Sequence, residues 1–337
     1  MTSTTSPTTS VAAGSTEPIS LRAALQHTEA AIAAVGAPSR TWDIGLYPLD
    51  VHLGGGLRAG DLALVAGAQG VGKTTATLQV ARNVVAAGGR ATYVCYEHTP
   101  AMLSERLLAL EAALVAGDRA PTLEEVRTTL SRPGRDGGLH ERLGGLPGMA
   151  EALATMDEYG DRLTLVGARG DVTGIEQIRD LVLDEEPGLL VVDYLQKVHV
   201  ADVPDEETRV ARVATGLKDL ALEADCPVLA IAAVDRDGLT SGRIRSKHLK
   251  GSVTLAYEAD VVLVLQDKYD VVAREHLVYD SSAAGAHHRW LVCSVEKNRH
   301  GEDHLDLEFR KRLSHGLLDP VGRMVEDRLI DERLDVQ

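Results

Sequence analysis

The chain has 337 residues, of which 44% are hydrophobic and 25% are charged, proportions that are ordinary for a soluble globular protein. This length suffices for one large α/β domain or two small ones. The net charge of −15 excludes a protein that grips duplex DNA over a broad basic face, and an aromatic content of 3% leaves little for stacking single-stranded bases.

Nothing in the sequence indicates export or insertion into a membrane. No apolar run approaches the length of a membrane span, and the N-terminus lacks the basic-then-apolar order of a secretion signal. The three cysteines, Cys95, Cys226 and Cys293, are widely spaced and form no C-x-x-C pair. We therefore expect a cytoplasmic protein with free thiols, without a disulfide or a zinc site.

The N-terminal part divides into a tail and a helix. Residues 1–19 are mostly Ser, Thr, Ala, Gly and Pro, a composition that predicts disorder. Residues 20–41 contain an Ala-rich helix at 20–34, whose partly apolar face includes Leu21 and Leu25. Because a lone short helix is marginal in water, we expect it to dock either on a neighbouring subunit or on its own domain.

The main domain is predicted over residues 42–320, followed by a tail at 321–337. Its short runs of Val, Leu and Ala alternate with helical patterns, which indicates a doubly wound α/β sheet with mostly parallel strands covered on both faces. The last strands follow one another without helices, so the sheet should end in antiparallel strands. The stretches 117–148 and 267–288 are interpreted as loops or insertions, the first around a short helix at 123–130. Strands are predicted at 62–66, 91–95, 163–166, 189–193, 227–232, 261–265, 290–295 and 305–309, and helices at 75–86, 101–114, 173–184 and 206–223.

A phosphate-binding loop follows the strand predicted at 62–66. Residues 67–75 fit the pattern G-x-x-x-x-G-K-[ST], and a helical pattern starts directly behind it. Glycines let the main chain curl so that several N–H groups face a phosphate, and the helix N-terminus adds its positive end. In this pattern Lys73 neutralises the β- and γ-phosphates of ATP, and the Thr74 hydroxyl holds Mg²⁺. The predicted nucleotide-binding residues are Gly67, Ala68, Gln69, Gly70, Val71, Gly72, Lys73, Thr74 and Thr75.

Two further strands end near an acid. Asp193 closes the apolar run at 189–193. Because ligands bind at the carboxyl ends of the strands in open α/β sheets, Asp193 is predicted to join Thr74 beside the metal. Glu97 follows the strand at 91–95 and is predicted to orient or deprotonate the attacking water. The alternative is that Glu97 serves only as a polar residue before the next helix.

Basic residues gather at two places in this acidic chain. The segment 236–250 holds five of them and one acid, and it is either a loop that tracks a nucleic-acid backbone or a solvated loop. Lys297 and Arg299 lie between the last two predicted strands. They either stabilise charge on a transferring phosphoryl group, in cis or in trans, or form an ordinary surface turn.

In this order the motifs resemble the C-terminal motor domain of DnaB-type replicative helicases, a family of RecA-like ATPases. The resemblance covers roughly residues 43–312. Its motifs are the phosphate loop, the strand before Glu97, Asp-Tyr-Leu-Gln at 193–196, Gly-Ser at 251–252 and Lys-Asn-Arg at 297–299.

The resemblance implies a role for each matching residue. Glu97 becomes the catalytic carboxylate, and Gln196 reads the nucleotide state. Lys297 and Arg299 reach the γ-phosphate bound by the next subunit, which requires a ring, expected to be a homo-hexamer. The helix at 20–34 resembles the family's linker helix.

The resemblance also implies contact with single-stranded DNA. The family's central loop, which touches the strand, falls at Lys250, Gly251 and Ser252. The predicted DNA-binding set is therefore Arg243, Arg245, Lys247, Lys250, Gly251 and Ser252.

The sequence departs from the family's pattern in ways that bear on function. The family's helical N-terminal domain has no counterpart ahead of residue 20, so we expect no collar from this chain. The Gln that usually couples the nucleotide to DNA is replaced by Ala233, and the Asn that follows it by Asp235.

Two functions are therefore weighed. The first is a magnesium-dependent, ring-forming ATPase that moves along or unwinds single-stranded DNA, with a replication or mobile-element protein as its partner. The second is an ATP-driven switch or assembly protein without helicase action, which the acidic composition and Ala233 favour.

Overall fold

The structure is a computed structural model that describes residues 18–33, 41–132, 137–251, 253–272 and 285–330. All but the last two residues of the predicted disordered tail lie outside these ranges, and so does Ser252. Within these ranges, no helix combines the length and the apolar character that crossing a membrane requires.

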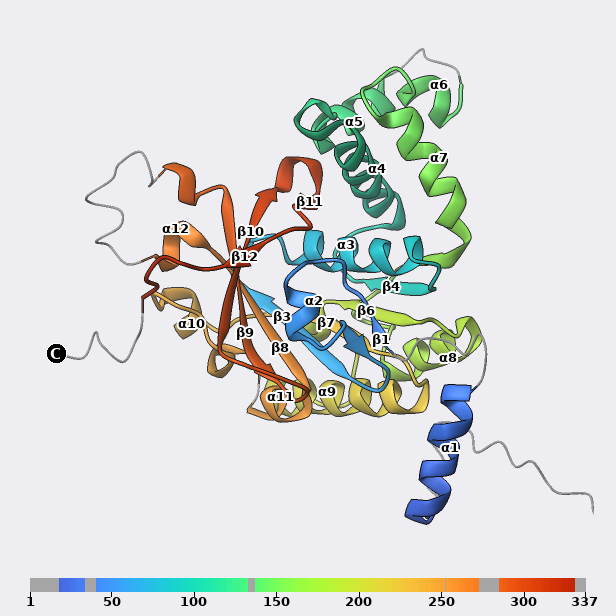
Figure 1. Ribbon diagram of the computed structural model, residues 1–337, viewed down its shortest axis with the longest axis vertical. Coiled ribbons are helices and arrows are strands. Elements are labelled where there is room, and N and C mark those ends of the chain that lie inside the picture. The colour runs from blue at the N-terminus through green and yellow to red at the C-terminus, as the bar shows by residue number, and fades with distance from the viewer. Residues whose placement is uncertain (1–17, 34–40, 133–136, 252, 273–284, 331–337) are drawn as a thin grey trace, which may run out of the picture.

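The centre of the molecule is one mixed sheet (Figure 1). The neighbours run in the order β11-β10-β9-β8-β3-β7-β6-β4-β5, and β12 pairs with β10. Strands from β8 to β5 along this path pair in parallel, whereas β9, β10, β11 and β12 pair antiparallel. The predicted doubly wound sheet with antiparallel strands at its C-terminal end is confirmed. The strands are β3 (Leu62–Gly67), β4 (Ala91–Cys95), β5 (Leu163–Gly167), β6 (Leu189–Asp193), β7 (Val228–Ala232), β8 (Val261–Asp267), β9 (Trp290–Asn298), β10 (Leu305–Arg312), β11 (Leu317–Leu318) and β12 (Arg323–Met324).

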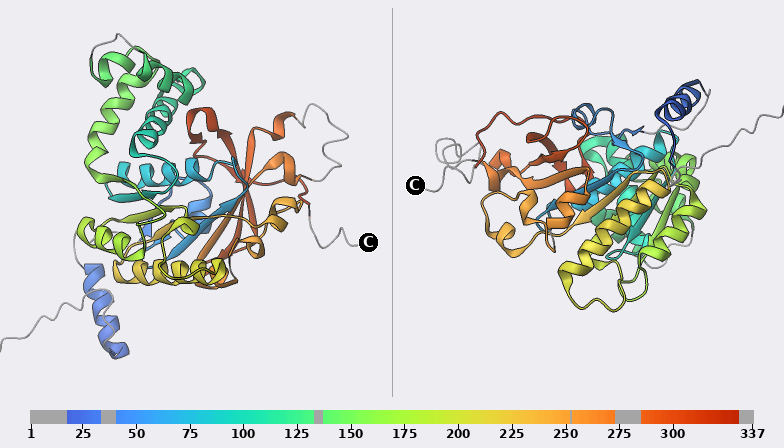
Figure 2. Two further views of the ribbon diagram at one scale, coloured as in Figure 1. Left: turned by 180° about the vertical axis from the view of Figure 1, so that it is seen from behind. Right: turned by 90° about the horizontal axis from the view of Figure 1, so that it is seen from below.

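Helices cover both faces of this sheet (Figure 2). One face packs against α3 (Lys73–Ala86) and the segment 44–57. The other packs against α8 (Ile175–Glu185) and α9 (Glu206–Glu223). The central strands are buried on both sides, which explains why they appear in the sequence as unbroken apolar runs.

A helical lobe stands beside the sheet, and it was only partly predicted. Its helices α4 (Pro100–Ala116), α5 (Leu123–Ser131), α6 (Leu139–Leu143) and α7 (Met149–Tyr159) enclose a separate apolar core. The stretch 117–148, interpreted as a loop or an insertion around one helix, thus contributes to a packed subdomain. The apolar spacing of Met149, Ala152, Leu153 and Met156 was the sequence signal for α7.

The remaining elements are short. Residues beyond 320 still contact the sheet, because β12 pairs with β10 and Leu329 forms a bridge with Val272. In α1 the side chains of Leu21 and Leu25 are 77% and 55% exposed, so among the described residues these two apolar side chains are uncovered. These elements are α1 (Leu21–Ala33), β1 (Thr41–Trp42), α2 (Leu49–His52), β2 (Leu57–Arg58), α10 (Arg236–Thr240), α11 (Val253–Glu258) and α12 (Lys268–Val271).

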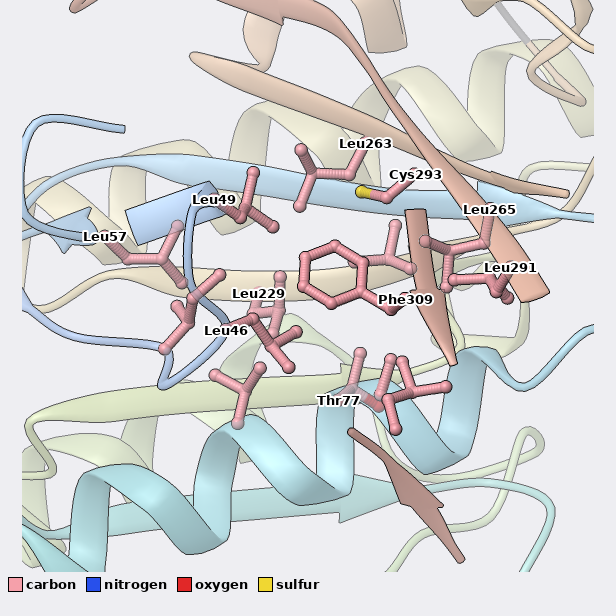
Figure 3. Close-up of a pocket in the computed structure, with 15 residues that line it drawn as sticks. Leu46, Leu49, Leu57, Thr77, Leu229, Leu263, Leu265, Leu291, Cys293 and Phe309 are labelled. Carbon is pink, nitrogen blue, oxygen red and sulfur yellow. The ribbon is translucent and has the colours of Figure 1, made fainter. Parts of the chain in front are cut away.

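A small cavity lies in the core between α3 and the sheet (Figure 3). Side chains from α3, the segment 44–57 and the strands β3, β7, β8, β9, β10 and β11 surround it, with Phe309 at its centre in the view. Its volume of about 30 Å³ is that of a single water molecule, and its wall is apolar. It is therefore a packing defect, and the ligand site must be sought elsewhere.

A buried ion pair fastens the helical lobe to α3. Arg82 donates from Nε and Nη2 to the two carboxylate oxygens of Glu111, at 2.6 and 2.8 Å. The Tyr159 hydroxyl donates to the same carboxylate at 2.8 Å, so one acid links α3, α4 and α7. Glu111 is only 2% exposed, and its charge depends on these partners.

Removal of one partner should be far more damaging than removal of both. Arg82→Met should lower the free energy of unfolding by about 3–5 kcal/mol, since it leaves the Glu111 carboxylate buried and unpaired. The double variant Arg82→Met/Glu111→Leu should recover much of this loss. Urea unfolding at pH 7 measures both. The exposed pair of Arg169 and Asp171 is the control, and Arg169→Met should leave the midpoint unchanged. A double variant as unstable as the single one would contradict the charge argument.

Candidate nucleotide-binding site

The predicted phosphate loop has the shape that binding an anion requires. It joins the end of β3 to the first turn of α3, and Gly70 and Gly72 have positive φ values of 79° and 109°. The positive φ of Gly72 favours glycine there, and a Cβ would also lie 2.9 Å from the end of the Leu313 side chain, which would have to move. Main-chain N–H groups and the positive end of α3 therefore face a common point.

Lys73 is held over its own loop. Its Nζ donates to the carbonyl oxygens of Gly67 and Ala68, both at 2.8 Å. Burial lowers the pKa of Lys73, whereas the carboxylates of Asp193 and Glu97 act in the opposite direction. The ammonium group forms no ion pair with a carboxylate of the described chain, and its positive charge is available to an anionic ligand.

The structure brings Asp193 to the phosphate loop. The Thr74 hydroxyl donates to Asp193 Oδ2 at 2.8 Å, and the Tyr93 hydroxyl donates to the same oxygen at 3.0 Å. Asp193 is 1% exposed, and burial raises its pKa although both hydrogen bonds favour the charged form.

These two oxygens fit a magnesium ion. A hydroxyl and a carboxylate are hard oxygen ligands, and magnesium completes its shell with phosphate oxygens and water. The described residues hold no cluster of three or more His, Cys, Asp or Glu suited to a metal. The ligand set therefore suits a cation that arrives with a nucleotide rather than one held by protein alone.

A cleft of about 650 Å³ opens above the loop. Seven of the nine predicted loop residues line it. The exceptions are Val71, which is buried in the core, and Ala68, which packs against the core on the other face of the sheet. Glu97 also lines the cleft; its side chain is 43% exposed and lies 3.9 Å from Lys197 Nζ. The structure thus collects the phosphate loop, Asp193 and Glu97 around one space.

Two residues of this cleft were missed in the sequence. Arg106 on α4 lines it, forms no hydrogen bond or ion pair within the described ranges, and has a buried Nε without a partner. Burial and the neighbouring Arg127 lower its pKa. His98 has a buried and unpartnered Nδ1, and burial and Arg106 lower its pKa. The signal for Arg106 was a charged residue on the face of α4 that also carries Leu103 and Leu110.

Lys297 and Arg299 do not reach this cleft in their own chain. Lys297 Nζ donates to the carbonyls of Ala256, Tyr257 and Ala259, at 2.7, 3.2 and 2.5 Å. Arg299 donates to Asp260 Oδ1 at 3.1 Å and to the Tyr257 carbonyl at 2.7 Å. Both cations are therefore docked at the C-terminal end of α11.

Gln196, predicted among the nucleotide-binding residues, is not among the side chains that line the cleft, and its role there stays a prediction. Its Oε1 accepts from the Ala233 amide and its Nε2 donates to the Lys250 carbonyl, both at 3.0 Å. Because these bonds occupy both ends of the side-chain amide, Gln196 is a bridge between two main-chain segments.

The predicted DNA-binding set changes in the structure. Arg243 is 6% exposed and bound to Asp306 and Ser294, so it is a core residue and cannot contact a strand. Arg245 pairs with Glu296 and Lys250 with Glu206, each at 2.9 Å. Lys247 is exposed, Gly251 is half-buried, and Ser252 lies outside the described residues. The composition of segment 236–250 shows its basic residues, but it does not show the acids elsewhere in the chain that pair with them.

Comparison with known proteins agrees with this geometry. Residues 46–238 match the model of the AAA domain family, and residues 169–315 match that of the DnaB-like helicase C terminal domain. A replicative DNA helicase DnaB from Rhodothermus marinus is 30% identical over 249 residues, which cover 71% of this chain and 24% of that protein. A DNA repair protein RadA from Haemophilus influenzae is 27% identical over 220 residues, 64% of this chain and 37% of that protein.

The chain thus spans well under half the length of these curated relatives. Among solved structures, one ATPase domain superposes with a TM-score of 0.71 at 17% identity, over 90% of this chain and 99% of that chain. A DnaB-like replicative helicase, solved in a study of its interactions with primase, superposes with a TM-score of 0.68 at 18% identity. The match covers 88% of this chain and 67% of that chain. These two structures share the fold of this chain.

The raised pKa of Asp193 predicts how stability depends on pH. The folded chain binds this proton more tightly than the unfolded chain, so the contribution of Asp193 to stability is present below about pH 3.9 and is lost as the pH rises through the raised pKa. Asp193→Asn should therefore raise the thermal unfolding midpoint at pH 7 in the absence of nucleotide and magnesium, and the difference should close in acid.

Asp205 provides the matched control, because hydrogen bonds with Thr208 at the start of α9 lower its pKa. Asp205→Asn should not stabilise the protein at pH 7. An Asp193→Asn variant that melts at or below the wild-type temperature at pH 7 would contradict the argument from burial.

Proposed function

The chain belongs to the AAA domain family and to the DnaB-type helicase C-terminal ATPase domains, and on this basis we propose that it is a magnesium-dependent ATPase that forms a ring and couples ATP hydrolysis to movement along single-stranded DNA. The observation that carries the proposal is the bonded pair of Thr74 and Asp193 beneath a phosphate loop whose lysine forms no ion pair with any described residue. A polyphosphate with a bound cation satisfies both groups at once.

Each residue of the cleft has a task in this proposal. The loop amides and Lys73 bind the phosphates, and Lys73 exchanges two loop carbonyls for phosphate oxygens. Thr74 and Asp193 would hold magnesium, which neutralises charge on the β- and γ-phosphates when bound. Glu97 orients the attacking water and accepts its proton. Arg106, which forms no ion pair within the described part of the chain, places its guanidinium against the charge that develops on the γ-phosphate.

The position of Lys297 and Arg299 supports a ring. Both are docked at the end of α11 rather than in the cleft of their own chain, and the Arg299 side chain is 49% exposed. A neighbouring subunit whose cleft meets this surface would receive both cations, as in other ATPases completed in trans. We infer a closed assembly of six subunits, with the exposed apolar face of α1 at a subunit contact.

The strand-binding surface in this proposal consists of the half-buried and exposed cations Arg245, Lys247 and Lys250 with Gly251. A replication or mobile-element protein would recruit the assembly to its strand. The buried free thiols of Cys95, Cys226 and Cys293 support a reducing, cytoplasmic setting. Burial raises the pKa of Cys95 to about 11 and those of the other two to about 12, so none is a nucleophile at neutral pH.

A second function has its own support. Because Arg245 and Lys250 are each paired with an acid of the same chain, the net charge available to a strand is small. An ATP-driven switch or assembly protein, which needs the cleft but no strand, fits this pairing as well.

Mixing of inactive variants tests the shared site. Lys73→Ala should abolish ATP turnover, whereas Arg299→Ala should lower kcat by about 10³-fold and leave nucleotide binding intact. A mixture of the two should recover part of the activity, because a ring then contains clefts with Lys73 from one subunit and Arg299 from the next. Steady-state phosphate release measures this recovery. Arg106 lies in the cleft of its own chain, so a mixture of Arg106→Ala with Lys73→Ala should stay inactive. A mixture of Lys73→Ala and Arg299→Ala that stays inactive as well would rule out the trans arrangement.

Stimulation by single-stranded DNA separates the two functions. ATP turnover should rise on addition of an oligonucleotide, and Lys250→Ala and Lys247→Ala should each lower the slope of log affinity against log salt by about 0.7. The control is Arg90→Ala. Arg90 is an exposed arginine that pairs with Glu185 and precedes β4, at the end of the strand that faces away from the nucleotide cleft. Turnover that does not respond to DNA in the wild type would favour the switch.

A further inference from the structure

The end of the basic segment is hydrogen bonded to the edge of the nucleotide cleft. The Lys250 amide donates to the Ala233 carbonyl at 2.8 Å, and the Asp235 amide donates to the His248 carbonyl at 2.9 Å. An antiparallel bridge joins Val234 and Leu249 between them. Ala233 and Val234 also line the cleft, so a short ladder connects the cleft wall to the segment that carries the exposed cations.

Gln196 closes this ladder. It lies three residues after Asp193, on the connection that leaves β6, and it is half-buried. Its amide group accepts from the Ala233 N–H and donates to the Lys250 carbonyl, so it bonds to one residue of each segment. Ala233 cannot make such a contact with its own methyl side chain. The side-chain link between these two segments is thus supplied by Gln196.

Helix α11 begins at Val253, two residues after Gly251. Gly251 packs so closely on α9 that a Cβ would lie 2.7 Å from Val210, and Leu255 of α11 is fully buried. The main-chain carbonyls at the end of α11 accept hydrogen bonds from Lys297 and Arg299. A shift of α11 therefore moves the acceptors that position both cations.

We propose that Gln196 is a positioning residue that locks the basic segment to the cleft wall, and that α11 carries a displacement of this segment to Lys297 and Arg299. The first half concerns contacts within one chain. The second half rests on the proposed function, in which these two cations act on the nucleotide of the next subunit. A displacement of Lys250 would then affect two nucleotide clefts. It would act on the cleft of its own chain through Gln196, and on that of the next subunit through α11 and the two cations.

Hydrogen–deuterium exchange on the full chain tests the lock without any ligand. In Gln196→Ala, the Ala233 amide loses its acceptor and should exchange about fivefold faster than in the wild type, as expected for the loss of one hydrogen bond. The Lys250 amide, which donates to the Ala233 carbonyl, should also exchange faster, because the loss of the Gln196 bond to the Lys250 carbonyl lets the ladder open more often. Gln196→Glu keeps an acceptor for the Ala233 amide and loses the donor to the Lys250 carbonyl, so Lys250 should be affected and Ala233 largely protected.

Gln79 offers a matched control. Its amide makes the same pair of bonds to the amide and carbonyl of Leu318, both at 2.8 Å, on the opposite face of the sheet. Gln79→Ala should lower the unfolding temperature to a similar degree and leave exchange at residues 248–259 unchanged. Unchanged exchange at Ala233 and Lys250 in a folded Gln196→Ala variant would overturn the lock.

A second measurement tests the relay. A non-hydrolysable ATP analogue with magnesium should slow exchange over residues 248–259 in the wild type and in Gln79→Ala, but not in Gln196→Ala. The ratio of DNA-stimulated to basal ATP turnover should fall to about one in Gln196→Ala only. A wild-type response retained by Gln196→Ala would overturn the relay. Calorimetry that shows no binding of the analogue to the wild type would instead refute the proposed function, and the ligand-free exchange result would still decide on the lock.

Discussion

The hydrogen bond from the Thr74 hydroxyl to the Asp193 carboxylate is the contact on which the site depends. It joins the start of α3 to the end of β6, and it forms only because the order of the sheet places β7 alone between β3 and β6. The carboxylate is held at 1% exposure by apolar strands, at a cost that shows in its raised pKa. Burial on both faces of the sheet must supply the stability that this charge takes away. A bound cation would relieve the same cost, so the destabilised group is the one that a ligand can satisfy.

The bonding partners of each basic side chain distinguish the structural cations from the proposed functional ones. Arg82, Arg243 and Lys268 are bound to acids in the core, where loss of a partner would leave a buried charge. Lys73 and Arg106 differ, because both line the cleft without a carboxylate partner in the described chain. Lys297 and Arg299 form a third class. Lys297 is held by three carbonyl groups, which fix its position and neutralise little of its charge, whereas Arg299 shares its hydrogen bonds between one carbonyl and the buried Asp260 carboxylate. Positive charge is thus kept available at two surfaces that only a second subunit could bring together.

The sequence predicted the parts of the structure that follow from local pattern. The limits of β4, β6 and α9 were predicted to the residue, because unbroken apolar runs and a capped amphipathic helix are local signals. The phosphate loop and its partner strand followed from motif order. What failed depended on distant partners: Arg243 counted as a surface cation until Asp306, 63 residues away, was seen to bind it. Gln196 likewise belongs to a motif near the nucleotide, yet its side chain bridges residues 37 and 54 positions further along the chain. The roles assigned to the cleft residues stay predictions.

The ion pairs of the basic segment differ in how readily phosphate can replace them. Release of Arg245 would leave Glu296, whose side chain is 4% exposed, buried without its partner, a change that typically costs about 3–5 kcal/mol. Release of Lys250 frees Glu206 into solvent, because both side chains are more than 40% exposed and such a pair contributes about 0–1 kcal/mol. A DNA phosphate would therefore displace the acid partner of Lys250 more readily than that of Arg245. Lys250 is also the residue whose carbonyl accepts from Gln196, so the cation that is easiest to exchange lies at the junction with the cleft wall. This arrangement suits a chain whose overall charge is −15: a single exchangeable contact can signal the presence of a strand without a basic face that would bind nucleic acid at all times.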